Sequence, residues 1–174
     1  MAGEGMIVQI VLDADVIIHF SKGNVLCLLP QIFPEYQYVV LDKVYEELKS
    51  VKSQLDRQMH FFGNMSLVEF TPAGEAMQEY ARLKTRFGKG ESACMVYCRY
   101  GSEIIGSSNL KDIRQYCVEH DIVFLTTMDF LYYAWKRGLL KVDEITAFIS
   151  EVRAKGSRLP EVDDITKYIP NALI

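Results

Sequence analysis

Five short apolar runs alternate with longer helical segments, and this alternation constrains the fold more than any other feature of the chain. The runs are rich in β-branched and aromatic residues and cover residues 7–12, 36–41, 66–70, 103–108 and 122–127. A continuous apolar run of this length is typical of a strand that is buried on both faces. Strands that alternate with helices form a parallel sheet covered on both sides. The sequence therefore predicts an α/β protein, a three-layer α/β/α sandwich with a central parallel sheet.

The segments between the runs carry helix signals. Asp42 is a good N-cap for a helix over residues 43–55, and Thr71 followed by Pro72 predicts a helix that reaches about Phe87. The apolar stripe of the first of these two helices consists of Val44, Leu48, Val51 and Leu55. The Gly-Lys-Gly sequence at residues 88–90 is expected to end the second of these helices and to separate it from the next one. Further helices are expected at residues 25–30, 91–101, 109–120, 128–138 and 142–156.

Length and composition are those of a globular protein with one core. A chain of 174 residues is long enough for one well-formed core and short for two, so we expect a domain over residues 1–155 and a tail over residues 156–174 that packs on the domain or on a partner. No apolar run approaches the roughly 20 residues that span a bilayer. The N-terminal sequence MAGEGM lacks the features of a signal peptide, and the four cysteines show no CxxC spacing. These features favour a cytoplasmic protein with reduced, buried thiols and no membrane partner.

The charge balance argues against indiscriminate binding to nucleic acid. The formal net charge is −4, whereas such binding needs a net basic surface. A nuclease is not excluded, because a carboxylate cluster that holds a divalent cation is acidic by construction. Two local basic stretches, RLKTRFGKG at residues 82–90 and WKRGLLK at residues 135–141, could contact phosphate or form solvated helix ends.

Polar side chains follow two of the predicted strands. Asp13 and Asp15 come after the first run, and Ser107, Ser108 and Asn109 end or follow the fourth run. Ligands of parallel sheets bind outside the carboxyl ends of the strands, so these side chains are expected at one edge of the sheet. This position explains why two aspartates are tolerated next to a strongly apolar strand.

Two helix starts can bring further acids to the same edge. Either Glu46 or Glu47 lies just after the second strand, and Glu91 follows the Gly-Lys-Gly sequence. Oxygen ligands without a His or Cys set suit Mg²⁺ or Mn²⁺. A divalent cation would also relieve the repulsion between such carboxylates. Each acid taken alone could instead be a capping or surface residue.

Four segments in order resemble the PIN-domain nucleases. They are IVLDADVIIHFSKGNVLCLLPQIF with YVVLDKVYEELKS, then FGKGESACMVYC, EIIGSSNLKDIRQYC and LTTMDFLYYAWKRGLL, and together they cover residues 7 to about 155. The resemblance implies a PIN-like fold and a ribonuclease that acts on single-stranded or structured RNA. It also implies Mg²⁺ or Mn²⁺ as cofactor and kinship with the toxin ribonucleases of toxin–antitoxin pairs, so an antitoxin-like protein is an expected partner.

The resemblance also assigns site residues. Asp13 matches the first acid of the family, Glu47 matches the second because Leu48 sets the register, and Glu91 matches the third. These three residues are the expected metal ligands. The fourth position falls on Asn109, where many members have Asp. Supporting roles are expected for nearby polar residues, namely Asp15, Ser107, Ser108 and Asp112, the last being the other candidate for the fourth position.

Two other functions compete with the ribonuclease. An incomplete acid set at Asn109 would suit a catalytically weakened PIN-like binding module. The sequence DADVI also loosely resembles the Asp-x-Asp motif of haloacid-dehalogenase-like phosphatases, but the acidic pair Asp163 and Asp164 lies in the tail and does not follow a strand. Association into a homodimer is a further expectation, because the segment 142–152 carries a wide apolar stripe made of Val142, Ile145, Phe148, Ile149 and Val152.

Overall fold

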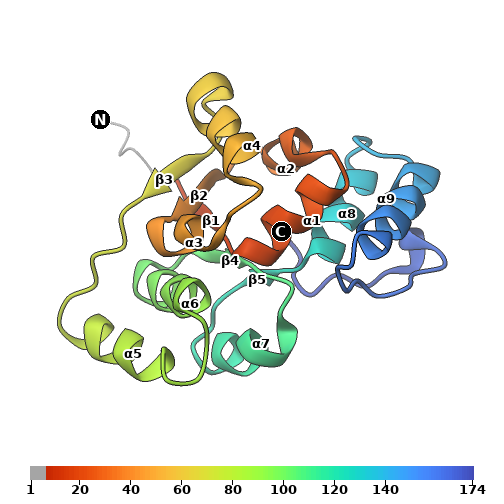
Figure 1. The fold of residues 1–174 in the computed structure, drawn as a ribbon. Helices are drawn as coiled ribbons and strands as arrows, with labels where there is room; N and C mark the ends of the chain where they lie inside the picture. Colours follow the sequence, from red (N-terminus) through yellow and green to blue (C-terminus); the bar gives the residue numbers. More distant parts are fainter. Residues whose placement is uncertain (1–6) are drawn as a thin grey trace, which may run out of the picture.

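The central sheet is parallel at every pairing, as the alternation of runs and helices predicts. The computed structural model describes residues 7–174, and its five-stranded sheet has the order β3-β2-β1-β4-β5 (Figure 1). The central strand is held from both sides, since Val11 pairs with Val39 of β2 and with Ile105 of β4. The strands are β1 (Gln9–Leu12), β2 (Gln37–Leu41), β3 (Ser66–Val68), β4 (Ile104–Gly106) and β5 (Phe124–Leu125).

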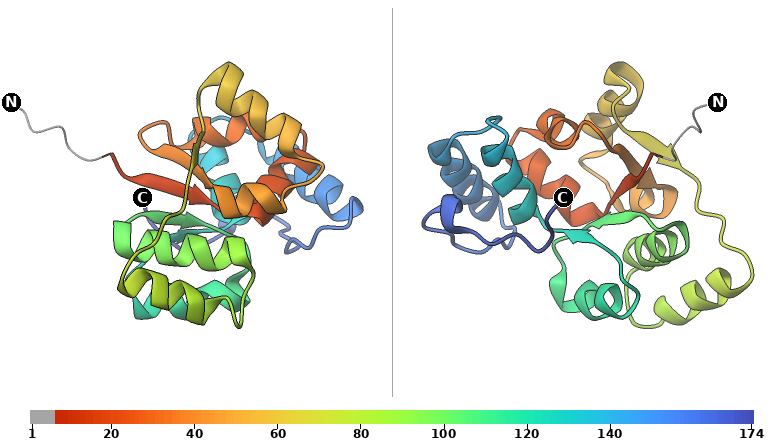
Figure 2. Two further views of the ribbon diagram at one scale, coloured as in Figure 1. Left: turned by 60° about the vertical axis from the view of Figure 1, so that its left-hand side comes forward. Right: turned by 180° about the vertical axis from the view of Figure 1, so that it is seen from behind.

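Helices cover both faces of this sheet, which confirms the three-layer α/β/α architecture. Helices α1, α2 and α4 lie on one face and α5 to α7 on the other, while α3 packs directly against α6 at the edge of the sheet, as the left view of Figure 2 shows. The order of the strands explains this division, because right-handed connections that run in opposite directions along a sheet cover opposite faces. The helices are α1 (Ala14–Lys22), α2 (Leu29–Ile32), α3 (Asp42–Glu47), α4 (Lys52–Asp56), α5 (Glu75–Leu83), α6 (Lys89–Gly101), α7 (Leu110–Glu119), α8 (Thr127–Lys136) and α9 (Val142–Ala154), with shorter helical turns η1 (Leu26–Leu28), η2 (Arg57–Phe62) and η3 (Ile165–Lys167).

The helix expected over residues 43–55 is two helices. The chain is extended at Leu48, with φ −80° and ψ 107°, so α3 ends at Glu47 and α4 begins at Lys52. Asp42 does not cap a helix from outside but is the first residue of α3, and its Oδ1 also accepts a hydrogen bond from the Phe70 amide at 3.0 Å. The apolar residues of the predicted stripe are nevertheless all buried, namely Val44, Leu48, Val51 and Leu55.

Other helix boundaries differ because of local backbone geometry. Helix α5 begins at Glu75 instead of after Thr71, because Gly74 has a φ of 56° that separates Pro72 from the helix. Pro30 lies in the first turn of α2 and does not end a helix. The chain is non-helical between α5 and α6, as expected, but only Gly88 of the Gly-Lys-Gly sequence lies outside a helix, since Lys89 and Gly90 already belong to α6.

The segment after the fifth run is also shorter as a strand than expected. Strand β5 ends at Leu125, and Thr126 is the N-cap of α8. Its hydroxyl accepts from the Asp129 amide, while the Asp129 carboxylate accepts from the Thr126 amide, so the two residues form a capping box. The reciprocal bonds favour an earlier helix start, at Thr127 instead of Met128.

The C-terminal part of the chain packs on the rest of it. Leu159 and Ile165 are buried, and the Tyr133 hydroxyl of α8 donates to the Ala172 carbonyl at 2.7 Å. The boundary at residue 155 stays a prediction. The apolar stripe of α9 is mostly covered by its own chain, since Ile145, Phe148, Ile149 and Val152 are buried, whereas Val142 at its start is exposed. It is therefore not the association surface that the sequence suggested, and a homodimer stays a prediction without this support.

Two remaining expectations concern the thiols and the N-terminus. Cys94, Cys98 and Cys117 are free and buried, but Cys27 is exposed, contrary to expectation. The sequence MAGEGM, on which the expectation about targeting depended, lies outside the described residues. Within residues 7–174 the structure has no helix that combines the length and the apolar character needed to cross a membrane.

Candidate active site

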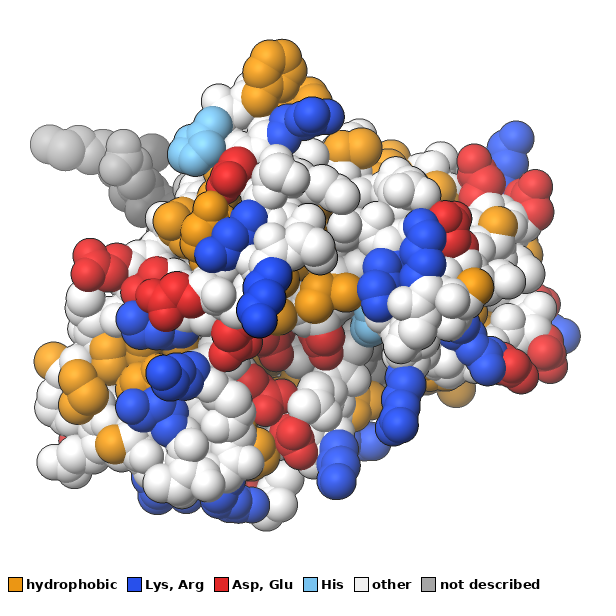
Figure 3. All heavy atoms as spheres, viewed as in Figure 1, with side chains coloured by type: hydrophobic (Ala, Val, Ile, Leu, Met, Phe, Trp, Pro, Cys, Tyr) orange, Lys and Arg blue, Asp and Glu red, His pale blue; other side chains and the backbone are white. Residues whose placement is uncertain are grey.

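The carboxyl ends of β1 and β4 meet at the point where the strand order reverses. From β1 the chain first builds β2 and β3 on one side and later β4 and β5 on the other. The Asp13 amide donates to the Gly106 carbonyl at 2.8 Å, so Asp13 and Ser107 leave neighbouring strands side by side. Such a switch point is where open α/β sheets bind ligands. Figure 3 shows acidic side chains gathered in the middle of this face, with Lys and Arg side chains around them.

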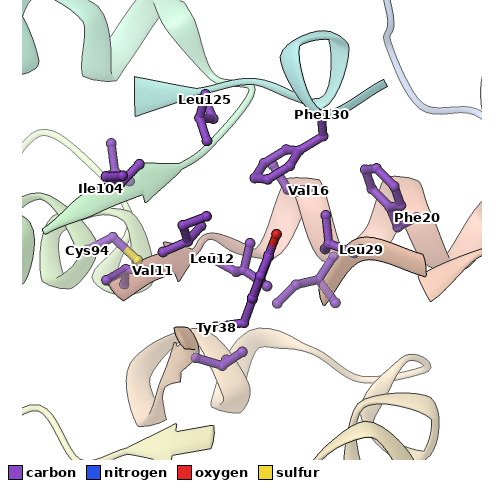
Figure 4. Packing of buried hydrophobic residues seen from close by; sticks show 14 of the residues in the cluster. Val11, Leu12, Val16, Phe20, Leu29, Tyr38, Cys94, Ile104, Leu125 and Phe130 are labelled. Atoms are coloured by element: carbon purple, nitrogen blue, oxygen red, sulfur yellow. The ribbon is translucent and has the colours of Figure 1, made fainter. Parts of the chain in front are cut away.

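The strands that end at this point are fixed from both faces of the sheet. Ile10, Val11 and Leu12 are fully buried, and Cys94 of α6 lies beside Val11 on one side (Figure 4). On the other side Phe20 of α1 packs edge-to-face against Phe130 of α8, with ring centroids 6.1 Å apart. Side chains that leave such a core are held in position by it. The site is therefore built on rigid elements and not on a long loop.

Asp13 is the most deeply buried acid of the group at the end of β1. Its Oδ1 accepts from the Ala14 amide at 2.8 Å, and its Oδ2 accepts from the Ser107 hydroxyl at 3.1 Å. Only 6% of the residue is exposed. Burial, together with the charges of Asp15 and Glu91, raises the pKa of Asp13 to about 8.

Asp15 is not in the strand but in the first turn of α1, on the same side as Asp13. Its Oδ1 accepts from the Val16 amide at 2.6 Å, and its Oδ2 accepts from the Ser108 amide at 2.9 Å. Burial raises the pKa of Asp15 to about 6, against the opposing effect of these backbone donors. Ser107 and Ser108 thus support one aspartate each, as their place after β4 suggested.

Glu91 reaches the same group from the first turn of α6. It is 8% exposed, and its Oε1 accepts from the Asn109 side-chain amide at 2.8 Å. The same Asn109 nitrogen donates to Asp112 Oδ2 at 2.8 Å, so one amide bridges two carboxylates. Burial and the charge of Asp112 raise the pKa of Glu91 to about 7, although the hydrogen bond from Asn109 opposes this.

Glu47 approaches from α3 and is exposed, unlike the other acids. Its Oε1 accepts from the Gly90 amide at 2.8 Å, which places it at the start of α6 beside Glu91. A Cβ atom at position 90 would lie 2.7 Å from Glu47 Oε2, so only glycine leaves room for this contact. Glu46, the alternative to Glu47, points elsewhere and lies 4.0 Å from the Lys43 ammonium.

The donor chemistry fits a hard divalent cation, but the ligands are not drawn together. Asp13, Asp15, Glu91 and Asp112 offer oxygen atoms, and no Lys or Arg within residues 7–174 forms a salt bridge with any of them. In the described part of the chain, however, no three His, Cys, Asp or Glu side chains form a group that could hold a metal ion. Asn109 explains part of this arrangement, since its amide holds Glu91 and Asp112.

A hydroxyl network behind Asp15 was not anticipated from the sequence. The Thr127 hydroxyl lies 2.8 Å from Ser108 Oγ and 2.8 Å from His19 Nδ1, and the Thr127 amide donates to Ser108 Oγ at 2.8 Å. His19 is buried, and burial, with a smaller effect from Lys22, lowers its pKa to about 4. Thr127 follows strand β5, so the rule that selected Ser107 and Ser108 could have found it.

The phosphatase alternative finds no support in the geometry. The acidic pair that it needs is Asp163 and Asp164, which lies in the C-terminal tail. Asp164 serves a local role there, because its Oδ1 accepts from the Thr166 amide and hydroxyl at the start of η3.

Comparison with known proteins agrees with the motifs in the sequence. A family model described as PIN domain matches residues 9–164, whereas no curated protein matches the chain. Among solved structures, VapBC2 from Rickettsia felis, bound to a DNA fragment from its promoter, aligns with a TM-score of 0.47 and 14% identity over 68% of this chain and 98% of that chain. PAE2754 from Pyrobaculum aerophilum aligns with a TM-score of 0.46 and 9% identity over 77% and 94% of the two chains. PIN domains are generally nucleases that use divalent metal ions. The match over residues 9–164 shows that this chain belongs to the PIN-domain family.

Proposed function

We propose that this protein is a Mg²⁺- or Mn²⁺-dependent ribonuclease that hydrolyses phosphodiester bonds in single-stranded RNA. The observation that carries the proposal is that two buried acids, Asp13 and Glu91, and the half-buried Asp15 lie together at the switch point of the sheet. Their pKa values are all raised, and burial is the main cause. Such a group of like charges is costly to keep ionised, and a bound divalent cation would remove that cost.

Asp13, Glu47 and Glu91 would hold the cation in this proposal. When bound, the cation polarises a phosphoryl oxygen and lowers the pKa of a coordinated water. Ser107 holds Asp13 through Oδ2, which fixes the orientation of its carboxylate. Asp15 is held by the Val16 and Ser108 amides at the start of α1 and would contribute negative charge beside Asp13.

We propose that Asn109 positions Glu91 and does not contribute charge to a bound cation. Its side-chain nitrogen donates to Glu91 and Asp112, so it sets the position of Glu91 relative to Asp13. An amide contributes no charge, and the number of charged ligands tunes the affinity for hard cations. We therefore expect one well-occupied metal position, held chiefly by Asp13 and Glu91, and a second that is weak.

The test is cleavage of a fluorescent single-stranded RNA by the purified chain. Cleavage is expected with Mg²⁺ or Mn²⁺ and is expected to stop in EDTA. Asp143→Asn serves as the matched control for substitutions of site acids, because Asp143 is an exposed aspartate on α9. A folded parent that cuts no RNA with either metal would replace the ribonuclease by the binding-module alternative. Cleavage that persists in EDTA would contradict the role of the metal.

An antitoxin-like protein partner is proposed from the family resemblance alone, and the homodimer that the sequence suggested stays a prediction without support from the α9 stripe. Size-exclusion chromatography with light scattering on the purified chain would show the homodimer directly. A constant monomer mass over a wide range of protein concentrations would contradict it.

A further inference from the structure

A polar cleft of about 260 Å³ opens between the end of α5 and the face of α7. It lies next to the cluster of Asp13, Asp15, Glu91 and Asp112, which we call the acid group. Asp112 belongs to the lining of this cleft and also accepts the hydrogen bond from Asn109, which in turn holds Glu91. The cleft therefore adjoins the site through two hydrogen bonds. Its basic lining residues are Arg82, Arg86 and Lys111, and its acidic ones are Asp112 and Glu119.

We infer that this cleft binds the phosphate backbone of the RNA beside the scissile bond, through Arg86 and Lys111. The inference rests on the proposed function and adds to it the direction in which the substrate leaves the acid group. Arg and Lys contacts to phosphate position a nucleic acid without reading its sequence. Single-stranded RNA is accordingly the occupant, bound by its backbone.

Two cations of the cleft are free to meet an anion. Arg86 and Lys111 are exposed, and neither forms a salt bridge or a side-chain hydrogen bond within residues 7–174. Arg82 differs, because it donates to both oxygens of Glu79 at 2.9 and 3.3 Å. The Arg86 guanidinium lies 5.1 Å from the centre of the Phe87 ring, which also lines the cleft.

One cation of the second basic stretch, residues 135–141, is engaged within the fold. Arg137 forms an ion pair with Glu35 at 2.6 Å, donates to the Ile32 carbonyl at 2.8 Å and stacks 4.7 Å above the Phe33 ring. Its guanidinium therefore ties α8 to the end of α2, whereas Lys136 and Lys141 are exposed and form no salt bridge within residues 7–174. The cleft that includes Asp112 is lined by residues of the first stretch, 82–90, and by none of the second, so the first stretch is the better candidate for the phosphate-contacting edge.

The experiment compares RNA binding by the parent and by Arg86→Gln, Lys111→Gln and the double variant. Binding of a fluorescent single-stranded RNA is followed by anisotropy under two conditions. In EDTA the cleft substitutions are made in the parent sequence, and in Mn²⁺ they are made in a chain that also carries Asp13→Asn, so that the RNA is not cleaved. The matched controls are Lys84→Gln on the segment after α5 and Arg114→Gln on α7. Both controls remove one exposed charge near the same helices but outside the cleft. Thermal unfolding verifies that each variant is folded.

The double variant is expected to bind RNA about tenfold more weakly at low salt. The slope of log K against log salt is expected to become shallower by about 1.4, since each phosphate contact on a single strand contributes roughly 0.7. Each control should change affinity less than twofold to threefold, and calorimetric Mn²⁺ binding should be unchanged in all cleft variants. Unchanged affinity in the double variant would overturn the inference. An equal loss of affinity in a protein that combines Lys84→Gln with Arg114→Gln would overturn it as well.

These binding data and the cleavage assay together separate this inference from the proposed function. If the parent cleaves RNA with Mn²⁺ but the double variant binds RNA like the parent, the cleft is wrong and the ribonuclease stands. If the parent does not cleave RNA but the double variant alone loses binding and its salt dependence, the cleft is supported and the ribonuclease fails.

Discussion

Two buried carboxylates follow strands β1 and β5, which flank β4 in the sheet, and their hydrogen-bonding needs are met in opposite ways. Asp129, at the start of α8, is fully buried and accepts five hydrogen bonds. Two come from Thr126, one from the Tyr168 hydroxyl and two from Asn171, so the C-terminal tail supplies three of the five donors. Asp13 is nearly as buried but accepts only two hydrogen bonds, from Ala14 and from Ser107.

The difference shows how a structural acid can be told from a functional one. Every oxygen of Asp129 is saturated by donors of the chain, and the carboxylate therefore ties the tail to α8 without needing an ion. Asp13 lies instead beside Asp15 and Glu91, whose charges make its ionisation more costly. A buried carboxylate with few donors and acidic neighbours is a candidate cation ligand, whereas one that is fully bonded holds the fold together.

The largest effect is expected for Asp13→Asn, which should slow cleavage by orders of magnitude and yet leave the fold intact. Losing several kcal/mol of charge stabilisation in the transition state would slow cleavage by about 100-fold to 1,000-fold. The folded-state pKa is raised from 3.8 to about 8, so folding loses stability as pH rises across this window, because the unfolded chain ionises first. An uncharged Asn avoids this loss. Metal-free Asp13→Asn should therefore unfold at a higher temperature than the parent at pH 8.

Calorimetry in EDTA measures this stability change, and the RNA assay in Mn²⁺ measures the activity. A variant that is less stable than the parent at pH 8 without metal would show that the Asp13 carboxylate is structural, like Asp129. Cleavage at the parent rate by Asp13→Asn would show that the observed activity does not come from this site.

The opposite pattern is expected for Asp129→Asn. The new amide nitrogen would face donors, leaving buried donors without an acceptor, and the free energy of unfolding should fall by about 3 kcal/mol or more. Urea unfolding followed by circular dichroism gives this value, with Asp143→Asn as the exposed control, which should change it by less than about 0.5 kcal/mol. A loss below 1 kcal/mol would mean that the tail is held to α8 by its apolar residues instead.

His19, whose Nδ1 lies 2.8 Å from the Thr127 hydroxyl, predicts how the stability of the fold responds to acid. Its pKa is lowered from 6.5 to about 4, so the folded state keeps His19 neutral while the unfolded chain binds a proton. Stability from this residue is fully present above pH 6.5 and is lost as pH falls to about 4. The shift of about 2.5 units corresponds to about 3 kcal/mol, at 1.36 kcal/mol per unit.

Urea unfolding of the parent and of His19→Gln between pH 7.5 and 4 measures this dependence by difference. The stability of the parent should fall more steeply than that of His19→Gln, because Gln does not titrate in this range. Parallel profiles for the two proteins would show that His19 is protonated in the folded state and that its contact with Thr127 does not depend on the neutral ring.

The smallest effect is expected at Asn109, whose uncharged amide occupies the position where many members of the family have an aspartate. Asn109→Asp adds a carboxylate beside Glu91 and Asp112 and should tighten Mn²⁺ binding about tenfold, since ligand charge tunes cation affinity. Asn109→Ala should lower activity less than Asp13→Ala does. A calorimetric Mn²⁺ titration of these variants, with RNA cleavage at low metal, is the measurement. If Asn109→Asp binds Mn²⁺ no better than the parent, Asp112 becomes the better candidate for the fourth position.

The sequence by itself determined the elements of the fold and the place of the acids along it. The apolar runs identified every strand of the sheet. For the central strand the reason is that a strand buried on both faces must be apolar throughout, as Ile10, Val11 and Leu12 are, whereas the edge strand β3 is largely exposed. The strand-end rule then selected Asp13 and Ser107, and these residues do lie on neighbouring strands in hydrogen-bond contact. Local patterns also pointed to the other acids. A helix that starts after the second strand pointed to Glu46 or Glu47, of which the family resemblance chose Glu47, and a helix that starts after the Gly-Lys-Gly sequence pointed to Glu91.

Only the tertiary structure decided how these acids are held and which other groups serve them. The break at Leu48, the contact of Glu47 with Gly90, the bridge from Asn109 to Glu91 and the engagement of Arg137 all depend on partners far away in the chain. Local patterns report burial and backbone preference, which depend on near neighbours. A hydrogen bond between residues 18 or 43 positions apart leaves no period in the sequence, because either partner alone is an ordinary polar residue.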